Sequence, residues 1–156
     1  VVADDDVFYP SCWLDLLIQS WNGDPKCVMS HRIHTIRFDD KCQILPYLEW
    51  GYEANNAVAS SVNFPTGVGG VLYPLGCFDR NVVDVEAYKK TALLQDDIWL
   101  YWMLRMNGSM VKSTRYDFKP MVWKGSGKVG MFNNNTSKSG NDECVNRMFN
   151  KYGPVW

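Results

Sequence analysis

Acidic residues adjoin in two short runs, and the first could bind a cation. Asp4, Asp5 and Asp6 follow the apolar stretch Val1–Ala3, which we expect to end a buried strand. Strand side chains alternate between faces, so Asp4 and Asp6 should point the same way and Asp5 away. Two carboxylates at a strand end suit Mg²⁺ or Mn²⁺, usually together with substrate phosphates. The alternative is a solvated acidic turn or a helix cap before Pro10, but α/β sheets place ligands at the carboxyl ends of strands, which favours a site.

The second run, Asp96-Asp97, opens the clearest helical pattern of the chain. A helix N-terminus stabilises the charged form of a carboxylate. Such a group stays ionised at neutral pH and can accept a proton as a general base. Acids are also common there as ordinary caps, and taken alone the pair favours capping.

A glycine-rich loop and two histidines complete the polar candidates. Thr66–Gly70 holds three glycines, which let a ligand approach the backbone closely. The loop lacks the Lys-Ser/Thr of a Walker motif and precedes a strand, unlike a dinucleotide fingerprint, so a plain turn is the alternative. His31 and His34 could contact a metal ion or an acceptor, although structural histidines are at least as common.

The elements that must position these residues alternate between strands and helices. This order predicts one α/β domain over residues 1–156. Apolar periodicity and turn residues give the individual elements. Strands are expected at 1–3, 71–73, 110–113 and 121–123, and a further strand begins at Cys27 and runs into a polar segment that ends at Phe38. Helices are expected at 10–21, 85–93, 96–106 and 141–153, with an irregular stretch or short helix around Trp50–Tyr52. Residues 124–139 are expected to form a mobile loop that could close over substrate.

Composition narrows the classes of partner. The 156-residue chain has a net charge of −1 and no basic run, which argues against a nucleic-acid partner. Five widely spaced cysteines without a CxxC pair predict reduced thiols in a cytoplasmic protein, not a zinc site or a disulfide scaffold. We find no signal peptide and no apolar run of membrane-spanning length. The chain begins with Val, and we expect an upstream half to precede it.

Four segments in order resemble the family 2-like glycosyltransferases with the GT-A fold, especially the bacterial surface-polysaccharide type. They are Val1–Asp6, Phe64–Pro74, Gln95–Leu100 and Asn141–Glu143. The resemblance implies a GT-A-like mixed sheet with flanking helices, present as the C-terminal catalytic half without the N-terminal nucleotide-binding part. It also implies Mn²⁺ or Mg²⁺, a nucleotide-sugar donor with UDP as the expected carrier, and a carbohydrate or lipid-linked acceptor that could bring the protein to a membrane.

The resemblance also implies residue roles. Asp6 would ligate the ion that bridges the diphosphate, and Asp4 would contact the nucleotide or the ion's water shell. Asp97 would be the general base of a direct, inverting displacement, with Asp96 in the place of the family's Glu. The segment Gly67–Tyr73 would line the floor between donor and acceptor. The substrate-binding candidates are Asp5, Gly69, Gly70, His31, His34 and Trp99.

Two other classes stay open. A metal-dependent phosphohydrolase of the haloacid dehalogenase type could use Asp4 and Asp6, but it would want Thr or Val where this chain has Phe8. A non-catalytic transferase-like domain could serve as a scaffold or binding module, although a dead site has no need of clustered acids. The QxxRW motif of processive transferases is missing, which argues against polymer synthesis by one enzyme.

Overall fold

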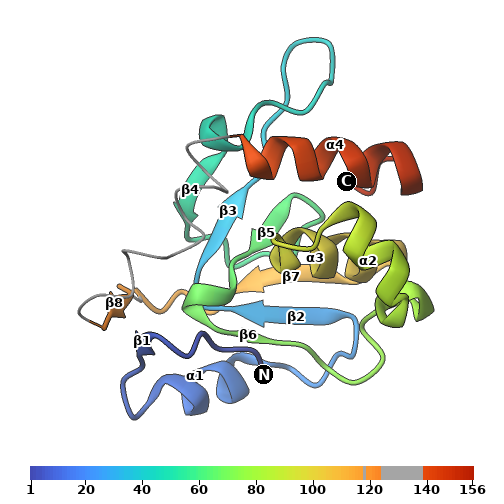
Figure 1. Cartoon of the computed structure of the whole chain (residues 1–156). Helices are drawn as coiled ribbons and strands as arrows, with labels where there is room; N and C mark the ends of the chain where they lie inside the picture. Colours follow the sequence, from blue (N-terminus) through green and yellow to red (C-terminus); the bar gives the residue numbers. More distant parts are fainter. Residues whose placement is uncertain (118, 124–138) are drawn as a thin grey trace.

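The computed structural model describes residues 1–117, 119–123 and 139–156. Within them the chain forms a mixed α/β fold of small sheets and helices (Figure 1). The predicted α/β class is therefore confirmed at this level. No helix among the described residues is long and apolar enough to cross a membrane.

The central sheet has the order β6-β2-β7. Its middle strand, β2 (Cys27–Ser30), is buried throughout, as expected for a short apolar strand covered on both faces. It pairs parallel to β7 (Met110–Ser113) and antiparallel to β6 (Val71–Leu72). Val2 extends this sheet by a single antiparallel bridge to β6. The predicted buried strand at the start of the chain is thus only this one bridge, because Val1 is 59% exposed.

Two further sheets flank the central one. β3 (Ile33–Thr35) lies between β4 (Gly51–Ala54) and β5 (Asn63–Pro65) and is antiparallel to both. β1 (Val7–Phe8) pairs antiparallel to β8 (Met121–Val122). The expected irregular stretch or short helix at Trp50–Tyr52 is wrong, since β4 begins at Gly51 and a short 3₁₀ helix, η1 (Tyr47–Glu49), precedes it.

Helices cover the sheets. They are α1 (Trp13–Ser20), α2 (Val85–Thr91), α3 (Asp96–Met106) and α4 (Gly140–Tyr152), with 3₁₀ turns η2 (Gly67–Gly69) and η3 (Arg80–Val83). In Figure 1, α1 and α4 lie at opposite ends of the molecule, and α3 lies between them. The main core forms around α3, six of whose residues are buried, including Tyr101 and Trp102.

The other predicted elements mostly hold. The helix at 96–106 and the strand at 110–113 have the predicted bounds. The helices at 10–21, 85–93 and 141–153 exist with bounds that differ by up to three residues. The glycine-rich loop predicted at 66–70 contains the 3₁₀ turn η2, and β5 directly precedes it. The loop predicted at 124–139 lies outside the described residues apart from Ser139.

Candidate active site

The two acidic runs meet across Gly67. The Gly67 backbone N–H donates to both carboxylate oxygens of Asp97, at 2.9 and 3.1 Å. A Cβ added to Gly67 would lie 3.1 Å from Asp97 Oδ1 and 3.4 Å from Asp4 Oδ1. Glycine therefore leaves open the space that both carboxylates face, and the fold brings together two motifs far apart in the sequence.

A tyrosine fixes the first acidic run to the glycine-rich segment. The Asp4 backbone N–H donates to the Tyr9 hydroxyl at 2.9 Å, and that hydroxyl donates to the Val68 carbonyl at 3.1 Å. Val68 belongs to η2, the turn that begins at Gly67. The chain of hydrogen bonds thus holds the Asp4 backbone beside the turn that binds Asp97. Sequence reasoning missed Tyr9, because this role depends on a contact across the fold.

Asp97 has the electrostatics of a group that can exchange a proton near neutral pH. Burial of its carboxyl, with the charge of Asp96 as the next cause, raises its pKa from 3.8 to about 7. The negative charge of Asp4 adds to the rise, whereas the Gly67 N–H and the positive charge of Arg32 oppose it. The prediction that the helix N-terminus keeps this carboxylate ionised at neutral pH is therefore wrong, because desolvation outweighs the Gly67 backbone donor.

Neighbouring acids disfavour a negative charge on Asp4 in the first acidic run. Burial raises the pKa of Asp4, and Asp6, Asp96 and Asp5 raise it further, in that order. Asp5 and Asp6 lie in a turn, so strand alternation does not set the directions of these side chains as predicted. Asp5 is exposed and Asp6 half-buried.

These carboxylates fit a divalent cation only as a partial ligand set. No group of three or more His, Cys, Asp or Glu suited to hold a metal ion exists among the described residues. Mg²⁺ is usually bound by one or two carboxylates, with waters and substrate phosphates as its other ligands. Asp4 and Asp6 can supply such a pair, and a cation beside Asp4 would offset the repulsion that raises its pKa.

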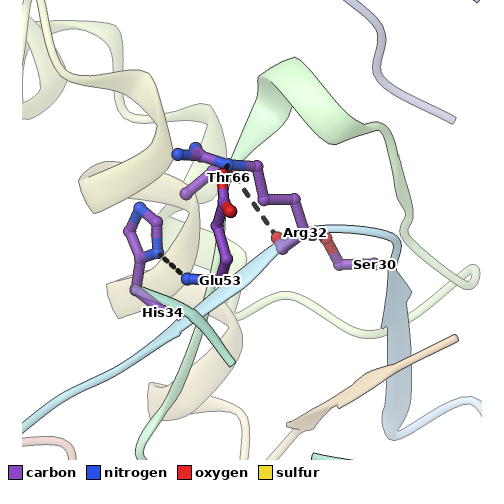
Figure 2. A network of polar contacts seen from close by, with 5 residues as sticks. All are labelled: Ser30, Arg32, His34, Glu53 and Thr66. Carbon is purple, nitrogen blue, oxygen red and sulfur yellow. Dashed lines mark hydrogen bonds and ion pairs between the residues drawn. The ribbon is translucent and has the colours of Figure 1, made fainter. Parts of the chain in front are cut away.

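Arg32, whose positive charge lowers the pKa of Asp97, also belongs to a second group of polar residues, drawn in Figure 2. Its guanidinium donates to the Thr66 hydroxyl at 3.2 Å and to the Glu53 carboxylate at 3.4 Å. The Glu53 backbone N–H in turn donates to His34 Nδ1 at 3.2 Å. Since Thr66 precedes Gly67, this network runs from the β3–β4 pair to the backbone that binds Asp97. Arg32 was not predicted, although it stands between the two histidines.

Both histidines are buried, and neighbouring groups hold their rings. His31 Nε2 lies 2.9 Å from the Trp13 carbonyl and Nδ1 lies 2.6 Å from the Thr114 hydroxyl. Burial lowers the pKa of His31, and it lowers the pKa of His34 to about 3. His34 is therefore neutral at physiological pH, with Nδ1 accepting the Glu53 N–H. The expected substrate or metal contacts of these two residues stay predictions.

The remaining predicted site residues lie in packed surroundings. A Cβ on Gly69 would lie 2.5 Å from the Cβ of Arg32, and one on Gly70 would overlap the Trp13 indole ring. The Trp13 indole N–H also donates to the Gly69 carbonyl at 2.8 Å. Trp99 is 3% exposed within the α3 core, and its indole N–H donates to a backbone carbonyl in η3. The site that the structure assembles therefore centres on Asp4, Gly67 and Asp97, with Asp96 and Arg32 acting on it through their charges.

Comparisons with models of known protein families, with curated protein sequences and with solved structures found no significant match to this chain.

Proposed function

We propose that the chain carries the catalytic site of a metal-dependent glycosyltransferase, which moves a sugar from a nucleotide-sugar donor to an acceptor hydroxyl. The observation that carries this proposal is that the Asp4 and Asp97 carboxylates both lie beside Gly67, within 3.4 Å of the point where a Cβ would stand. In this proposal the first acidic run would hold a cation and the diphosphate, and the second would take a proton from the acceptor hydroxyl. A sugar transfer between two oxygens needs both functions at adjacent positions.

Asp97 would be the general base. A base is most effective when its pKa lies near the working pH, because it is then substantially ionised and still accepts a proton readily. The pKa of about 7 meets this condition. The Gly67 N–H holds the carboxylate in one orientation, so its position does not depend on a flexible contact. Asp97 would take the proton of the acceptor hydroxyl while that oxygen displaces the nucleotide from the sugar, with inversion.

Asp4 and Asp6 would hold Mn²⁺ or Mg²⁺. When bound, such an ion stabilises the negative charge that develops on the leaving diphosphate. Asp4 is fixed for this role through its backbone bond to Tyr9. Asp96 would keep the pKa of Asp97 high, since its charge disfavours a second negative charge beside it.

The wider assignment rests on the family resemblance. We propose a GT-A-like arrangement, in which an upstream part would bind the base and ribose of a UDP-sugar. The acceptor would be a carbohydrate or a lipid-linked sugar on the cytoplasmic side of a membrane. The ordered motifs at Val1–Asp6, Phe64–Pro74 and Gln95–Leu100 support this proposal, because the fold brings Asp4, Gly67 and Asp97 from these three segments into one site.

The test is nucleotide release from a panel of sugar nucleotides by the full-length protein. The assay compares Mn²⁺ with a chelator and supplies simple sugar and polyprenyl-phosphate-sugar acceptors. We expect Mn²⁺-dependent release from one donor, and its loss in Asp6→Ala but not in Asp15→Ala, an exposed acid on α1. Unchanged metal dependence in Asp6→Ala would refute the metal role. No release from any donor, with a Mn²⁺ titration also silent, would favour the scaffold, and cleavage of a simple phosphate ester would favour the phosphohydrolase.

A further inference from the structure

A small polar hollow of about 120 Å³ adjoins Arg32. This volume is below the range of drug-sized ligand sites, about 300–1,000 Å³, so the hollow suits a single small ring and not a larger ligand. Its lining includes the side chains of Arg32, Glu53, Asn55, Tyr116 and Asp117. Arg32 also donates to Thr66, the residue before Gly67, so the hollow adjoins the loop that orients Asp97.

An irregularity in the β3–β4 pair directs Glu53 toward this hollow. Ile33 pairs with Ala54 and Thr35 pairs with Gly51, so two residues of β4 oppose His34 alone. Such an extra residue bends the strand and re-aims a side chain, and these features recur next to functional sites. Glu53 itself adopts the left-handed conformation, with φ of +48°, which is uncommon for a residue other than glycine, asparagine or aspartate.

Glu53 is held at two points. Its backbone N–H donates to His34, and its carboxylate accepts from Arg32 (Figure 2). The side chain is nevertheless 67% exposed, so the carboxylate keeps room for another partner. Left-handed backbone at such a residue costs free energy, which the surrounding contacts must offset. The strain is consistent with a carboxylate that is fixed for binding and not merely for folding.

An aromatic ring forms another part of the lining. The Tyr116 ring lies 5.1 Å from the His31 ring in an edge-on arrangement, and its backbone N–H donates to the Thr114 hydroxyl at 3.2 Å. His31 is in turn bonded to Trp13 and Thr114. The Tyr116 ring therefore packs against the buried His31 ring, while Tyr116 itself is half-buried.

We propose that this hollow binds a neutral pyranose ring of the acceptor, with Glu53 and Asp117 accepting hydrogen bonds from its hydroxyls and Arg32 and Asn55 donating to them. Glu53 is paired with Arg32 and Asp117 with Lys119, at 3.4 and 3.8 Å, but both carboxylates would face the ligand, which disfavours a sugar that carries its own carboxylate. The Tyr116 ring offers an apolar face to the C–H groups of the sugar. This proposal rests on the proposed transferase function, since it names the substrate that would reach Asp97.

The test measures the binding of methyl glycosides to the isolated protein by NMR, without nucleotide or metal. The probes are the methyl glycosides of glucose, galactose and mannose, with methyl glucuronide as the anionic comparison. We expect at least one neutral glycoside to shift the resonances of Asn55 and Tyr116, and the glucuronide to bind more weakly. Glu53→Gln and Tyr116→Ala should each weaken binding by about fivefold or more, the effect of about 1 kcal/mol.

Glu86→Gln is the matched control. Glu86 is also an exposed acid paired with a cation, Lys89, at 3.4 Å, but it lies on α2. Binding should be unchanged in this variant. The site proposal is overturned if no neutral glycoside binds, if the glucuronide binds as tightly, or if Glu53→Gln and Tyr116→Ala both bind like the unmodified protein with dispersed amide spectra. Glycoside binding by a full-length protein that releases no nucleotide would overturn the transferase and keep the sugar site.

Discussion

The Gly67 backbone N–H donates to both carboxylate oxygens of Asp97, although one residue follows β5 and the other opens α3. A single backbone donor thus fixes a carboxyl whose pKa burial raises to about 7. If the role of Asp97 is structural, its carboxylate should stabilise the fold. If its role is proton transfer, the carboxylate can lower the stability of the protein. The two cases are separated by replacing the side chain.

Asp97→Asn should make the protein more stable and less active. The folded pKa of about 7 lies above the ordinary 3.8, so folding favours the protonated form. That contribution is complete below pH 3.8 and is lost as the pH rises through 7. Asparagine resembles the protonated form at every pH. Its gain in unfolding free energy should therefore grow between pH 4 and 8, to about 1–3 kcal/mol, measured by urea unfolding.

The turnover of the same variant, measured in the full-length protein, should fall by about 100-fold or more, as expected for the loss of a general base. Donor affinity should change little, because the base acts mainly in the transition state. Near-normal turnover together with reduced stability would identify Asp97 as a structural cap instead.

Asp96→Asn should shift the pH dependence of the reaction. The charge of Asp96 is the second cause of the high pKa of Asp97, after burial. Its removal should lower the pKa of Asp97, so the acid limb of the kcat/KM profile should move to lower pH. The shift can be checked independently of catalysis by carboxyl-carbon NMR of Asp97. An unmoved limb and an unmoved carboxyl resonance would show that the two acids do not interact.

Gly67→Ala should reduce activity without unfolding the protein. The added methyl would lie 3.1 and 3.4 Å from oxygens of Asp97 and Asp4 and would displace one or both. The backbone of Gly67 is not left-handed, so alanine adds no backbone strain there, and the overpacking should lower the unfolding free energy by about 1–3 kcal/mol. A displacement of this size at a reacting group should lower kcat/KM by about tenfold or more. Full activity would mean that the space between the carboxyls is not used.

Gly70→Ala should destabilise the protein far more than Gly76→Ala. Both glycines are left-handed, with φ of +93° and +83°, so alanine costs each about 1–2 kcal/mol in backbone strain. A Cβ on Gly70 would also overlap the Trp13 ring, whereas one on Gly76 would meet nothing within 4 Å. Overpacking should add about 1–3 kcal/mol at Gly70 alone. Equal losses in urea unfolding would show that α1 shifts freely to admit the methyl.

Acidification should weaken the fold through His34. Its folded pKa of about 3 lies below the ordinary 6.5, so folding favours the neutral form. This contribution is present above pH 6.5 and is lost as the pH falls toward 3, with a slope of up to about 1.4 kcal/mol per pH unit. His34→Gln should flatten the decline between pH 6 and 5. If the stability of His34→Gln falls with pH as steeply as that of the unmodified protein, the decline comes from other groups. His31→Gln, at the other buried histidine, is measured for comparison.

Local patterns predicted the elements that depend on their own residues. α3 and β7 have the predicted bounds, because apolar periodicity and flanking polar residues define them. β4 was missed because its conformation depends on distant partners: Gly51 and Ala54 pair with β3, and Glu53 bonds to the buried ring of His34. No pattern within residues 39–61 contains that information.

The candidate site, like the fold, could be predicted only where its residues stand out in the local sequence. The acidic residues stand out by type and spacing, and resemblance placed the two runs in one site. Tyr9 and Arg32 carry no such signal, because each acts through a hydrogen bond to a residue far along the chain, Val68 and Thr66 respectively. Trp99 was among the predicted substrate contacts, but its side chain is buried in the core around α3.

The electrostatic contact between Asp4 and Asp97 makes proton and cation uptake reciprocal. The charge of Asp4 is one cause of the high pKa of Asp97. A positive ion at Asp4 would remove this cause and make Asp97 release its proton more readily. By thermodynamic linkage, deprotonation of Asp97 must then increase the affinity for the cation by the same factor. Cation binding would thus lower the pKa of Asp97, and a measurement of that pKa would show whether the cation is bound.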